Sequence, residues 1–386
     1  MRSRRHCGSG RLGLDGCVVV GGLSLLVWTY AGYPLTVALA ARRRRPAEPG
    51  PLPTMTVLIP AYNEAEFIAK KVRNSRELDY PSELVQILVV NDGSDDGTAE
   101  LARAEGAHVI DVNPRRGKSN GINFGMSEAT GDIVVLTDAN GSVDAGSLRA
   151  IAAAFADPAV AVVSGAKVPE GTGAHGGGEQ AYWRYENFVK TAEGRLGCTV
   201  GADGGIYAVR RTTFTPLPAG TLGDDFIVPL SALAAGWKVT HTDRARARES
   251  TSNSVSDEFE RRTRISAGIW QGLLTHRSLL HPRNGWVSVA LGTHRGLRTV
   301  VIPPSLPVIT VATASLARRS KVAKFLLVAQ LLGWGGATAG AATDARAFAL
   351  PYQFAMTNVA AMRGGLRFFR RRQATTWKRT SRGQWT

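Results

Sequence analysis

The sequence predicts an α/β protein in which a mostly parallel sheet is flanked by transmembrane helices. Between Met55 and Trp237, short apolar runs alternate with helical patterns, and this alternation is typical of a parallel sheet with helices on both faces. A run of 25 residues from Cys17 to Ala41 contains no charge, which suits a membrane-spanning helix of about 20 residues. Further apolar stretches follow Gly292, so membrane-embedded segments are expected on both sides of the α/β region.

Composition narrows the class of protein. The chain has 386 residues, of which 44% are hydrophobic, and this fraction is too high for a disordered protein. Three cysteines cannot form a disulfide framework, and neither they nor the seven histidines show a zinc-binding spacing. A net charge of +16 first suggests either nucleic acid or an anionic membrane as a partner.

The uncharged run is predicted to span a membrane. Residues 1–16 form a basic N-terminus, residues 17–41 the transmembrane helix, and residues 42–53 a basic, proline-rich linker. A cleaved signal peptide is the alternative, because arginines precede the run and residues 38–40 (Ala-Leu-Ala) resemble a cleavage site. However, the run is longer than the apolar core of a signal peptide, about 7–15 residues. The four arginines that follow it also favour the cytoplasm.

The α/β region is expected to extend over residues 54–275. Apolar runs stopped by turn residues predict the strands, and helical composition between them predicts the helices. The expected strands are residues 56–60, 85–90, 108–112 and 132–140, and the expected helices are residues 65–78, 98–107 and 118–129. The Gly-rich stretch 171–178 is predicted to be a flexible loop.

Acidic residues follow two of the expected strands. Asp92 comes after the apolar run at 85–90, and Asp138 comes after the run at 132–136. Because ligands bind beyond the carboxyl ends of parallel strands, we expect both carboxylates to lie in the functional site. The chain contains no GxxxxGK[ST] pattern, so a P-loop is excluded.

Several motifs occur in order along this region. They are TVLIPAYNEAEFI at 56–68, VVNDGSDDGT at 89–98, TDAN at 137–140, LGDDF at 222–226 and RRTRISAG at 261–268. Together they resemble the membrane-bound family 2 glycosyltransferases, the branch of the cellulose, hyaluronan, chitin and poly-N-acetylglucosamine synthases. The resemblance covers residues 55–268, with a weaker echo in TWKRTSR at 376–382. It implies a GT-A catalytic domain, which is Rossmann-like with a mostly parallel sheet.

The resemblance implies a nucleotide-sugar site at the first strand ends. The residues that would line the uracil and ribose are Pro60, Ala61, Tyr62 and Glu64. Asp92 would accept a hydrogen bond from the uracil ring NH, which suits a carboxylate, although its NDGS sequence is also typical of a plain turn. Lys118 would lie near the nucleotide phosphate. A cation ahead of a helix is disfavoured by the helix dipole, so an anionic partner is expected there.

The TDAN motif implies a divalent cation. In the family, an Asp-x-Asp pair holds Mg²⁺ or Mn²⁺ on the diphosphate, and the matching residues here are Asp138 and Asn140. Hard divalent cations take oxygen ligands, and alternate positions point both side chains the same way. An amide oxygen still ligates, but one negative charge is lost, so weaker metal binding is expected. A turn after a strand is the alternative.

The LGDDF motif implies the catalytic base. The second acid, Asp225, would take the proton of the attacking hydroxyl, with Asp224 beside it. Two adjacent acids near a negatively charged donor are expected to raise one carboxyl pKa. The alternative is an N-cap for the helix that follows.

The RRTRISAG motif departs from the family pattern. Arg264 matches the arginine that faces the diphosphate, whereas Arg261 and Ile265 stand where the family has Gln and Trp. Trp270 lies about one and a half helical turns further on. The alternative is the basic face of an amphipathic helix at lipid headgroups.

Acceptor binding is expected beside this motif. The resemblance implies Trp183, Tyr185, Gly201 and Asp203, with Trp270 as a further contact. Sugars stack on aromatic faces, and small residues let a glycan chain pass close to the backbone. Core packing is the alternative for the aromatic residues.

These assignments predict an inverting glycosyltransferase. It would move glucose or N-acetylglucosamine from a UDP-sugar to a glycan acceptor, giving a β-linked exopolysaccharide or cell-surface glycan. A non-processive enzyme that loads one sugar onto a polyprenyl phosphate or another lipid-linked acceptor is an alternative, slightly favoured by Arg261 and Ile265. A membrane scaffold with a decayed transferase domain is a further alternative, motivated by Asn140 and Ile265.

The C-terminal third is expected to return to the membrane. Its predicted parts are an interfacial amphipathic connection at 276–298, two or three membrane-embedded segments within 299–369, and a basic cytoplasmic tail at 370–386. The favoured pair of crossings is 325–342 and 348–369, with the proline-containing stretch 299–317 interfacial or re-entrant.

The distribution of charge decides between the two partners that the net charge suggests. Residues 1–45 carry eight Arg and one Asp, residues 345–386 carry nine Lys or Arg and no acid, and the rest is balanced. Because the excess lies beside predicted membrane segments, it indicates positive-inside orientation and binding to anionic lipid, and nucleic acid is not expected as a partner. Nucleotide sugars are made in the cytoplasm, so we expect a multi-pass protein of the inner or plasma membrane with a cytoplasmic catalytic domain.

Overall fold

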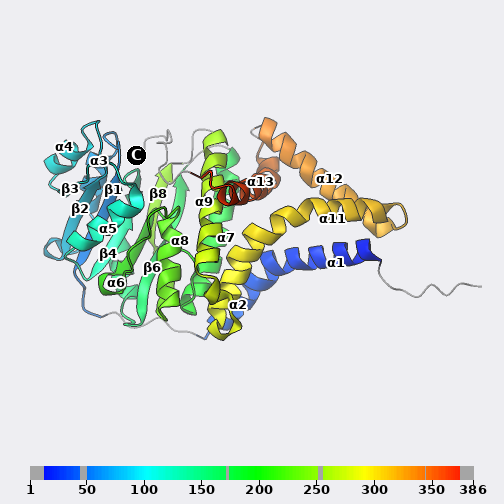
Figure 1. Cartoon of the computed structure of the whole chain (residues 1–386), viewed down its shortest axis with the longest axis horizontal. Helices are drawn as coiled ribbons and strands as arrows, with labels where there is room; N and C mark the ends of the chain where they lie inside the picture. The colour runs from blue at the N-terminus through cyan, green and yellow to red at the C-terminus, as the bar shows by residue number, and fades with distance from the viewer. Residues whose placement is uncertain (1–12, 44–49, 171–173, 251–254, 344, 374–386) are drawn as a thin grey trace, which may run out of the picture.

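The computed structural model describes residues 13–43, 50–170, 174–250, 255–343 and 345–373. Within these residues, eight strands form one sheet (Figure 1). In order across the sheet, the strands are β3 (His108–Asp111), β2 (Val85–Asn91), β1 (Met55–Ala61), β4 (Ile133–Thr137), β7 (Ile206–Arg210), β6 (Val160–Glu170), β8 (Lys238–Ser250) and β5 (Gly141–Val143). The predicted echo at 376–382, with Trp377, Thr380 and Arg382, lies outside the described residues.

The first four strands of the sheet are parallel. β1 pairs with β2 and with β4, and β2 pairs with β3, so the carboxyl ends of these strands lie along one edge. β7 then runs antiparallel between β4 and β6. β8 is parallel to β6, and β5 is antiparallel to β8. The predicted α/β fold with a mostly parallel sheet is confirmed.

Strand β1 shows that the sheet separates two hydrophobic cores. Leu58 lies in one core with Ile122, whereas Val57 and Ile59 lie in the other core with Val72. Because side chains alternate between the faces of a strand, helices must cover both faces, as predicted. These helices are α3 (Ile68–Arg76), α4 (Thr98–Ala104), α5 (Lys118–Glu128), α6 (Ser147–Ala154) and α8 (Asp224–Ala234).

Where the structure describes the Gly-rich stretch 171–178, the chain is helical and not the loop that the sequence predicts. Residues 171–173 lie outside the described residues, and from Ala174 onward the chain is helical in α7 (Ala174–Arg195). α7 packs against β8 and α2. Tertiary packing of a long helix outweighs the low helix propensity of a few glycines in its first turns.

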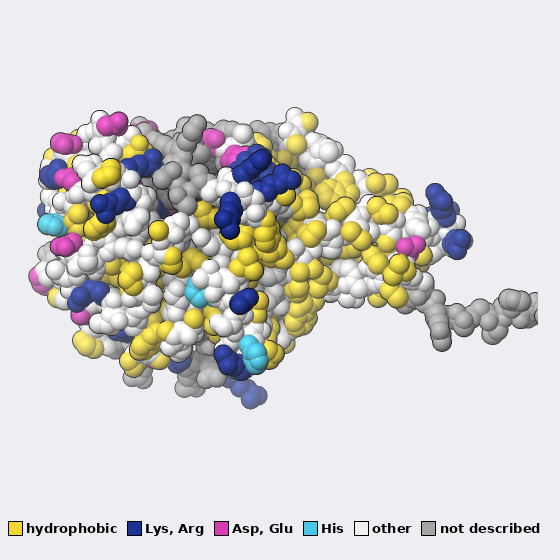
Figure 2. All heavy atoms as spheres, viewed as in Figure 1, with side chains coloured by type: hydrophobic (Ala, Val, Ile, Leu, Met, Phe, Trp, Pro, Cys, Tyr) yellow, Lys and Arg dark blue, Asp and Glu magenta, His cyan; other side chains and the backbone are white. Residues whose placement is uncertain are grey.

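Among the residues that the structure describes, three helices are long and apolar enough to cross a membrane. They are Leu14–Ala41, Trp286–Ala317 and Lys321–Ala342. The first comprises α1 (Leu14–Val27), a π-helical turn (Trp28–Gly32) and α2 (Tyr33–Ala41). The second comprises α10 (Trp286–Ala290), a π-helical stretch (Leu291–Val301) and α11 (Ile302–Ala317). The third is α12. Hydrophobic side chains cover them where they project from the α/β domain (Figure 2).

The candidate spans include the predicted crossing at 325–342 and differ from the predicted pair in the other crossing. The proline-containing stretch belongs to a continuous helix, because Pro303 and Pro304 stand at the start of α11 directly after the π-helical stretch. Pro307 also lies inside α11. A proline within a helix removes one backbone hydrogen bond, and the π-helical stretch directly before Pro303 is a local departure from the regular hydrogen-bond pattern. The helix therefore continues without interruption through residue 298, where the sequence predicts a boundary between two segments.

The predicted crossing at 348–369 is not among the candidate spans found in the described part of the chain. This segment is α13 (Ala349–Phe369), which packs along α9 (Val255–Thr275). Glu260 of α9 pairs with Arg363 at 2.9 Å and with Arg367 at 2.5 Å. Part of the C-terminal positive charge therefore contacts the α/β domain.

Candidate functional site

A cavity of about 720 Å³ lies at the carboxyl ends of the parallel strands, which is the size of a small-molecule site. Its donor end is formed by residues 60–64, Asp92 and Asp138, and its membrane end by Tyr30, Glu186, His294 and Arg298. Most of the predicted site residues line it, namely Pro60, Ala61, Tyr62, Glu64, Asp92, Lys118, Asp138, Asn140, Trp183, Gly201, Asp203, Asp224, Asp225 and Arg264.

Backbone groups hold the donor end. Asp92 is 5% exposed, and its two carboxylate oxygens accept from the backbone N–H groups of Arg116 and Gly117, each at 2.7 Å. The Arg115 guanidinium stacks 3.5 Å from the centroid of the Tyr62 ring. Asp92 therefore fixes the loop that follows β3, and because a carboxylate accepts about four hydrogen bonds, its predicted contact with a base stays a prediction.

Lys118 joins two acidic motifs. It is the first residue of α5, and its amine lies 2.9 Å from Asp138 Oδ1 and 3.3 Å from Asp224 Oδ1. Burial alone would lower the pKa of this amine, but the two carboxylates outweigh burial and hold the pKa above its ordinary value. The anionic partners expected ahead of this helix are thus supplied by the protein itself, next to the expected position of the diphosphate.

Asp138 and Asn140 lie on the turn between β4 and β5. The Asn140 side-chain oxygen is buried, and among the described residues no group donates to it. No cluster of three or more His, Cys, Asp or Glu side chains that could hold a metal occurs in the described part of the chain. Two oxygen ligands nevertheless fit Mg²⁺ or Mn²⁺, because such ions complete their shell with water and substrate phosphate.

Asp224 and Asp225 open helix α8. The N-cap is Gly223 and its position carries no side-chain cap, so the predicted alternative of an acidic N-cap is wrong. Asp224 accepts from the Tyr207 hydroxyl at 2.7 Å. Burial, followed by the charge of Asp224, raises the pKa of Asp225 to about 6, which agrees with the shift expected from two adjacent acids.

The three arginines of the basic motif on α9 line the cavity. Glu258 pairs with Arg261 at 2.8 Å and with Arg262 at 2.7 Å along the helix. Arg264 interacts electrostatically with Asp225 and Asp138.

Two predicted acceptor residues do not line the cavity as the described residues define it. The Tyr185 hydroxyl donates to the backbone oxygen of Tyr30 at 3.3 Å. Trp270 packs edge-on against Phe369, with ring centroids 4.9 Å apart. The alternative of core packing describes Tyr185, which packs against a hydrophobic core, whereas Trp270 contacts an exposed phenylalanine. Tyr182 and the predicted Trp183 line the cavity.

Asp203 and Trp183 do line it. Asp203 is 4% exposed, one of its oxygens lacks a hydrogen-bond donor among the described residues, and burial raises its pKa. The Lys167 amine lies 5.6 Å from the centroid of the Trp183 ring.

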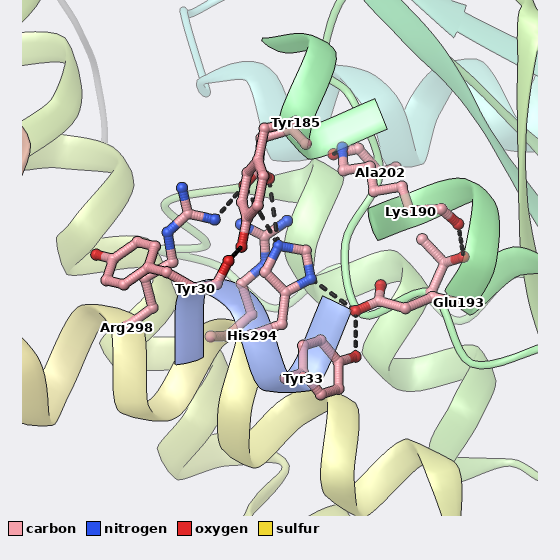
Figure 3. Close-up of polar contacts among 11 residues, drawn as sticks. Tyr30, Tyr33, Tyr185, Lys190, Glu193, Ala202, His294 and Arg298 are labelled. Carbon is pink, nitrogen blue, oxygen red and sulfur yellow. Dashed lines mark hydrogen bonds and ion pairs between the residues drawn. The ribbon is translucent and has the colours of Figure 1, made fainter. Parts of the chain in front are cut away.

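The membrane end contains residues that the sequence analysis did not single out (Figure 3). His294 Nδ1 lies 2.7 Å from Glu193 Oε1, and its Nε2 lies 3.3 Å from Glu186 Oε2. The Tyr33 hydroxyl donates to Glu193 at 2.6 Å, and Arg298 pairs with Glu186. A sequence pattern could have indicated some of these residues, because Glu186, Lys190 and Glu193 recur at helical intervals and therefore lie on one face of α7.

Comparisons with known proteins agree with this geometry. Residues 56–214 match the family "Glycosyl transferase family 2". A stretch of 97 residues is 35% identical to "Probable glycosyltransferase YdaM" of Bacillus subtilis (strain 168), covering 23% of each chain. A stretch of 94 residues is 37% identical to "Poly-beta-1,6-N-acetyl-D-glucosamine synthase" of Staphylococcus aureus (strain COL), covering 23% of this chain and 22% of that protein. The chain thus matches less than a quarter of the length of these relatives.

A solved structure matches over a larger part of the chain. It is the mannosyltransferase PcManGT from Pyrobaculum calidifontis in complex with GDP-Man and Mn²⁺, with a TM-score of 0.72 and 21% sequence identity. The match covers 92% of this chain and 100% of that one. At this identity the likeness concerns the fold, which extends beyond the α/β domain to the helices around it.

Proposed function

Since this chain carries a glycosyltransferase family 2 domain with a GT-A fold, we propose that it is an inverting hexosyltransferase. The donor is a UDP-sugar, with glucose or N-acetylglucosamine transferred to a glycan acceptor. The product is a β-linked exopolysaccharide or cell-surface glycan. One observation carries the proposal: Lys118, Asp138, Asp224 and Asp225 meet in a single cavity that also reaches the candidate membrane helices.

The reaction is a single displacement at the anomeric carbon. The acceptor oxygen forms a bond to this carbon while the bond to the diphosphate breaks, and the acceptor proton passes to the Asp225 carboxylate. Asp224 accepts from Tyr207 and pairs with Lys118, and its charge contributes to the raised pKa of Asp225, which favours proton uptake there. Lys118 and Arg264 offer positive charge to the departing diphosphate.

Asp138 and Asn140 are the residues that would hold a divalent cation, Mg²⁺ or Mn²⁺, on the diphosphate. Such a cation supplies charge neutralisation to the leaving group. The buried Asn140 oxygen without a donor among the described residues supports this role, as does the Mn²⁺ named for the solved mannosyltransferase.

The donor is tested by a screen of nucleotide sugars. The purified full chain in detergent is given UDP-glucose, UDP-N-acetylglucosamine or GDP-mannose, with and without Mn²⁺, and release of the nucleoside diphosphate is measured. We expect metal-dependent release of UDP; the name of the staphylococcal relatives favours the N-acetylglucosamine donor. Release of GDP alone would overturn the UDP assignment, and no release with any donor would favour the decayed scaffold.

Transfer of one sugar to a polyprenyl phosphate or another lipid-linked acceptor is the second candidate. It is favoured by the extent of the cavity, whose lining includes Tyr30, Arg298 and Thr299 of the candidate membrane helices. Electrophoresis of the radiolabelled product separates the two candidates. A ladder or a long polymer supports the synthase, whereas a single lipid-soluble product supports the lipid acceptor.

We also propose a multi-pass location in the cell membrane, with the α/β domain on the cytoplasmic side and anionic lipid at the basic ends. With Trp286–Ala317 and Lys321–Ala342 as the spans, the connection at 318–320 lies on the side away from the domain, next to the start of α1, where Ser315 donates to Asp15 at 2.7 Å. This differs from the predicted topology, which kept that connection inside. Ser320→Cys should react with an impermeant maleimide on intact cells, and reaction only after permeabilisation would reverse the orientation.

A further inference from the structure

Lys71 is a fully buried lysine beneath the donor end of the cavity. It lies on α3 and has 0% exposure. Its amine donates to the Thr137 hydroxyl at 2.7 Å and to the backbone oxygen of Gly141 at 2.8 Å. These two residues directly flank the segment from Asp138 to Asn140, so one amine holds both ends of the turn that carries the proposed cation ligands.

The same contact extends to the other side of the cavity. The Thr137 hydroxyl donates to the backbone oxygen of Gly205 at 2.8 Å. The neighbouring Gly204 is packed tightly, because a Cβ placed there would lie 3.3 Å from an Asp225 oxygen and 3.9 Å from an Asp138 oxygen. Through Thr137, the Lys71 amine is therefore connected to the backbone that separates the candidate base from the candidate metal ligand.

The core alone gives no reason for an amine at this position. Burial lowers the pKa of Lys71 to about 7, although the charges of Asp138 and Glu249 act in the opposite direction. Its two hydrogen-bond acceptors are neutral oxygens. Buried charge is unfavourable unless it is well compensated, so the observed reason for an amine here is the pair of oxygens that it holds.

We propose that Lys71 is a positioning residue for the donor site, which holds the turn from Asp138 to Asn140 so that its two oxygen ligands converge on the cation of a nucleotide diphosphate. This proposal rests on the proposed function. Because Asn140 is neutral, the affinity of this pair of ligands depends more on geometry than it would for two carboxylates. An amine anchored to both flanks of the turn provides that geometry without occupying a ligand position.

Asn74 provides a matched control on the same helix. Its side-chain amide donates to the backbone oxygen of Val143 at 3.0 Å, and its side-chain oxygen accepts from the Val143 N–H at 2.8 Å. Each of the two residues thus makes two hydrogen bonds from α3. Those of Lys71 go to the end of β4 and the start of β5, and both of those of Asn74 go to Val143 in β5. Only those of Lys71 flank the ligand turn.

The test compares Lys71→Met with Asn74→Ala in the full chain in detergent. Calorimetry measures the affinity for UDP, or for GDP if the wild type prefers it, with and without Mn²⁺. We expect Lys71→Met to weaken binding in the presence of Mn²⁺ by about tenfold, as is typical for residues that orient metal ligands, while metal-free binding stays within about twofold. The KM for the donor should rise more than kcat falls. Asn74→Ala should keep the Mn²⁺-dependent affinity for the nucleotide, even if it lowers the melting temperature as much as Lys71→Met does.

Each outcome separates this proposal from the proposed function. A wild-type chain that binds neither nucleotide with Mn²⁺ contradicts the proposed function itself. A wild type that binds, together with a Lys71→Met variant of equal Mn²⁺-dependent affinity, contradicts the positioning role alone. Where Lys71→Met does not fold, Thr137→Val removes one acceptor and leaves the bond to Gly141. Unchanged Mn²⁺-dependent affinity in that variant would also refute the role.

Discussion

At the donor end of the cavity, Asp92 is fixed by backbone groups close in the fold, whereas at the membrane end the charged side chains are fixed by one another. Asp92 is held by two consecutive backbone N–H groups. In contrast, Glu186 and Glu193 contact His294 and Arg298, which lie about a hundred residues further along the chain. The donor end is thus formed by the edge of the sheet, and the membrane end is formed by the packing of helices against one another.

The two ends also differ in how their charges are used. At the membrane end, burial alone would raise the pKa of Glu186, but Arg298 and His294 hold it well below its usual range. Both carboxylates there pair with residues of the second candidate membrane helix, although Glu193 Oε2 is buried without a donor among the described residues. At the donor end, Asn140 keeps an oxygen without a donor among the described residues. Because the charged groups of the membrane end mainly pair with one another, we expect substitutions there to affect stability first, and substitutions at the donor end to affect ligand binding first.

The largest expected effect is at the candidate base. Asp225→Asn should lower kcat by about a thousandfold, because loss of a general base costs about 10²–10⁴ in rate. Nucleotide binding should persist, since Asp225 does not carry the diphosphate. Transfer of radiolabelled sugar and calorimetric UDP binding measure the two effects, and turnover near that of the wild type would remove Asp225 from the mechanism.

At the membrane end, the expected effect is on stability. Glu193→Ala should lower the free energy of unfolding by about 3 kcal/mol, because it leaves His294 and the Tyr33 hydroxyl without their buried acceptor. Thermal unfolding in detergent measures this loss. Glu105→Ala, which removes a partly exposed ion pair with Arg73, is the control and should cost no more than about 1 kcal/mol. Weaker nucleotide binding without any loss of stability would contradict the division of the cavity into two ends.

The same division explains what could be predicted from the sequence. The positions of Asp92 and Asp138 were predictable, because a short apolar run marks a buried strand and the acid that follows it lies at the carboxyl end of that strand, where ligands bind in parallel sheets. The roles expected for Tyr185 and Trp270 were not, because neighbouring helices decide which aromatic side chains reach a cavity. Likewise, α13 has the composition of a marginal membrane segment, and only its ion pairs with Glu260 show that it packs on the domain.

A smaller effect is expected at the metal ligands. Asn140→Asp should tighten Mn²⁺ binding in the presence of UDP by about tenfold, because an added negative charge about 4 Å from a cation contributes from about 1 kcal/mol in water to about 4 near a protein surface. Asn140→Ala should weaken it. Calorimetric titration of Mn²⁺ measures both changes. Equal affinity in all three proteins would show that residue 140 is not a ligand.

The smallest effect concerns the pH at which the base becomes active. A carboxylate accepts a proton only when it is ionised, so with the pKa of Asp225 raised to about 6 the transfer rate should be low below that pH and rise through it. Asp224→Asn removes the like charge that contributes to this raised pKa, so the acidic limb of the pH–rate profile should move to lower pH, by about one unit or less. Asp95→Asn, an exposed acid on the loop after β2, should leave the limb in place. A limb that does not move with Asp224→Asn would mean that burial alone sets the pKa of the base, and that the paired acids of α8 serve to hold Lys118 rather than to tune Asp225.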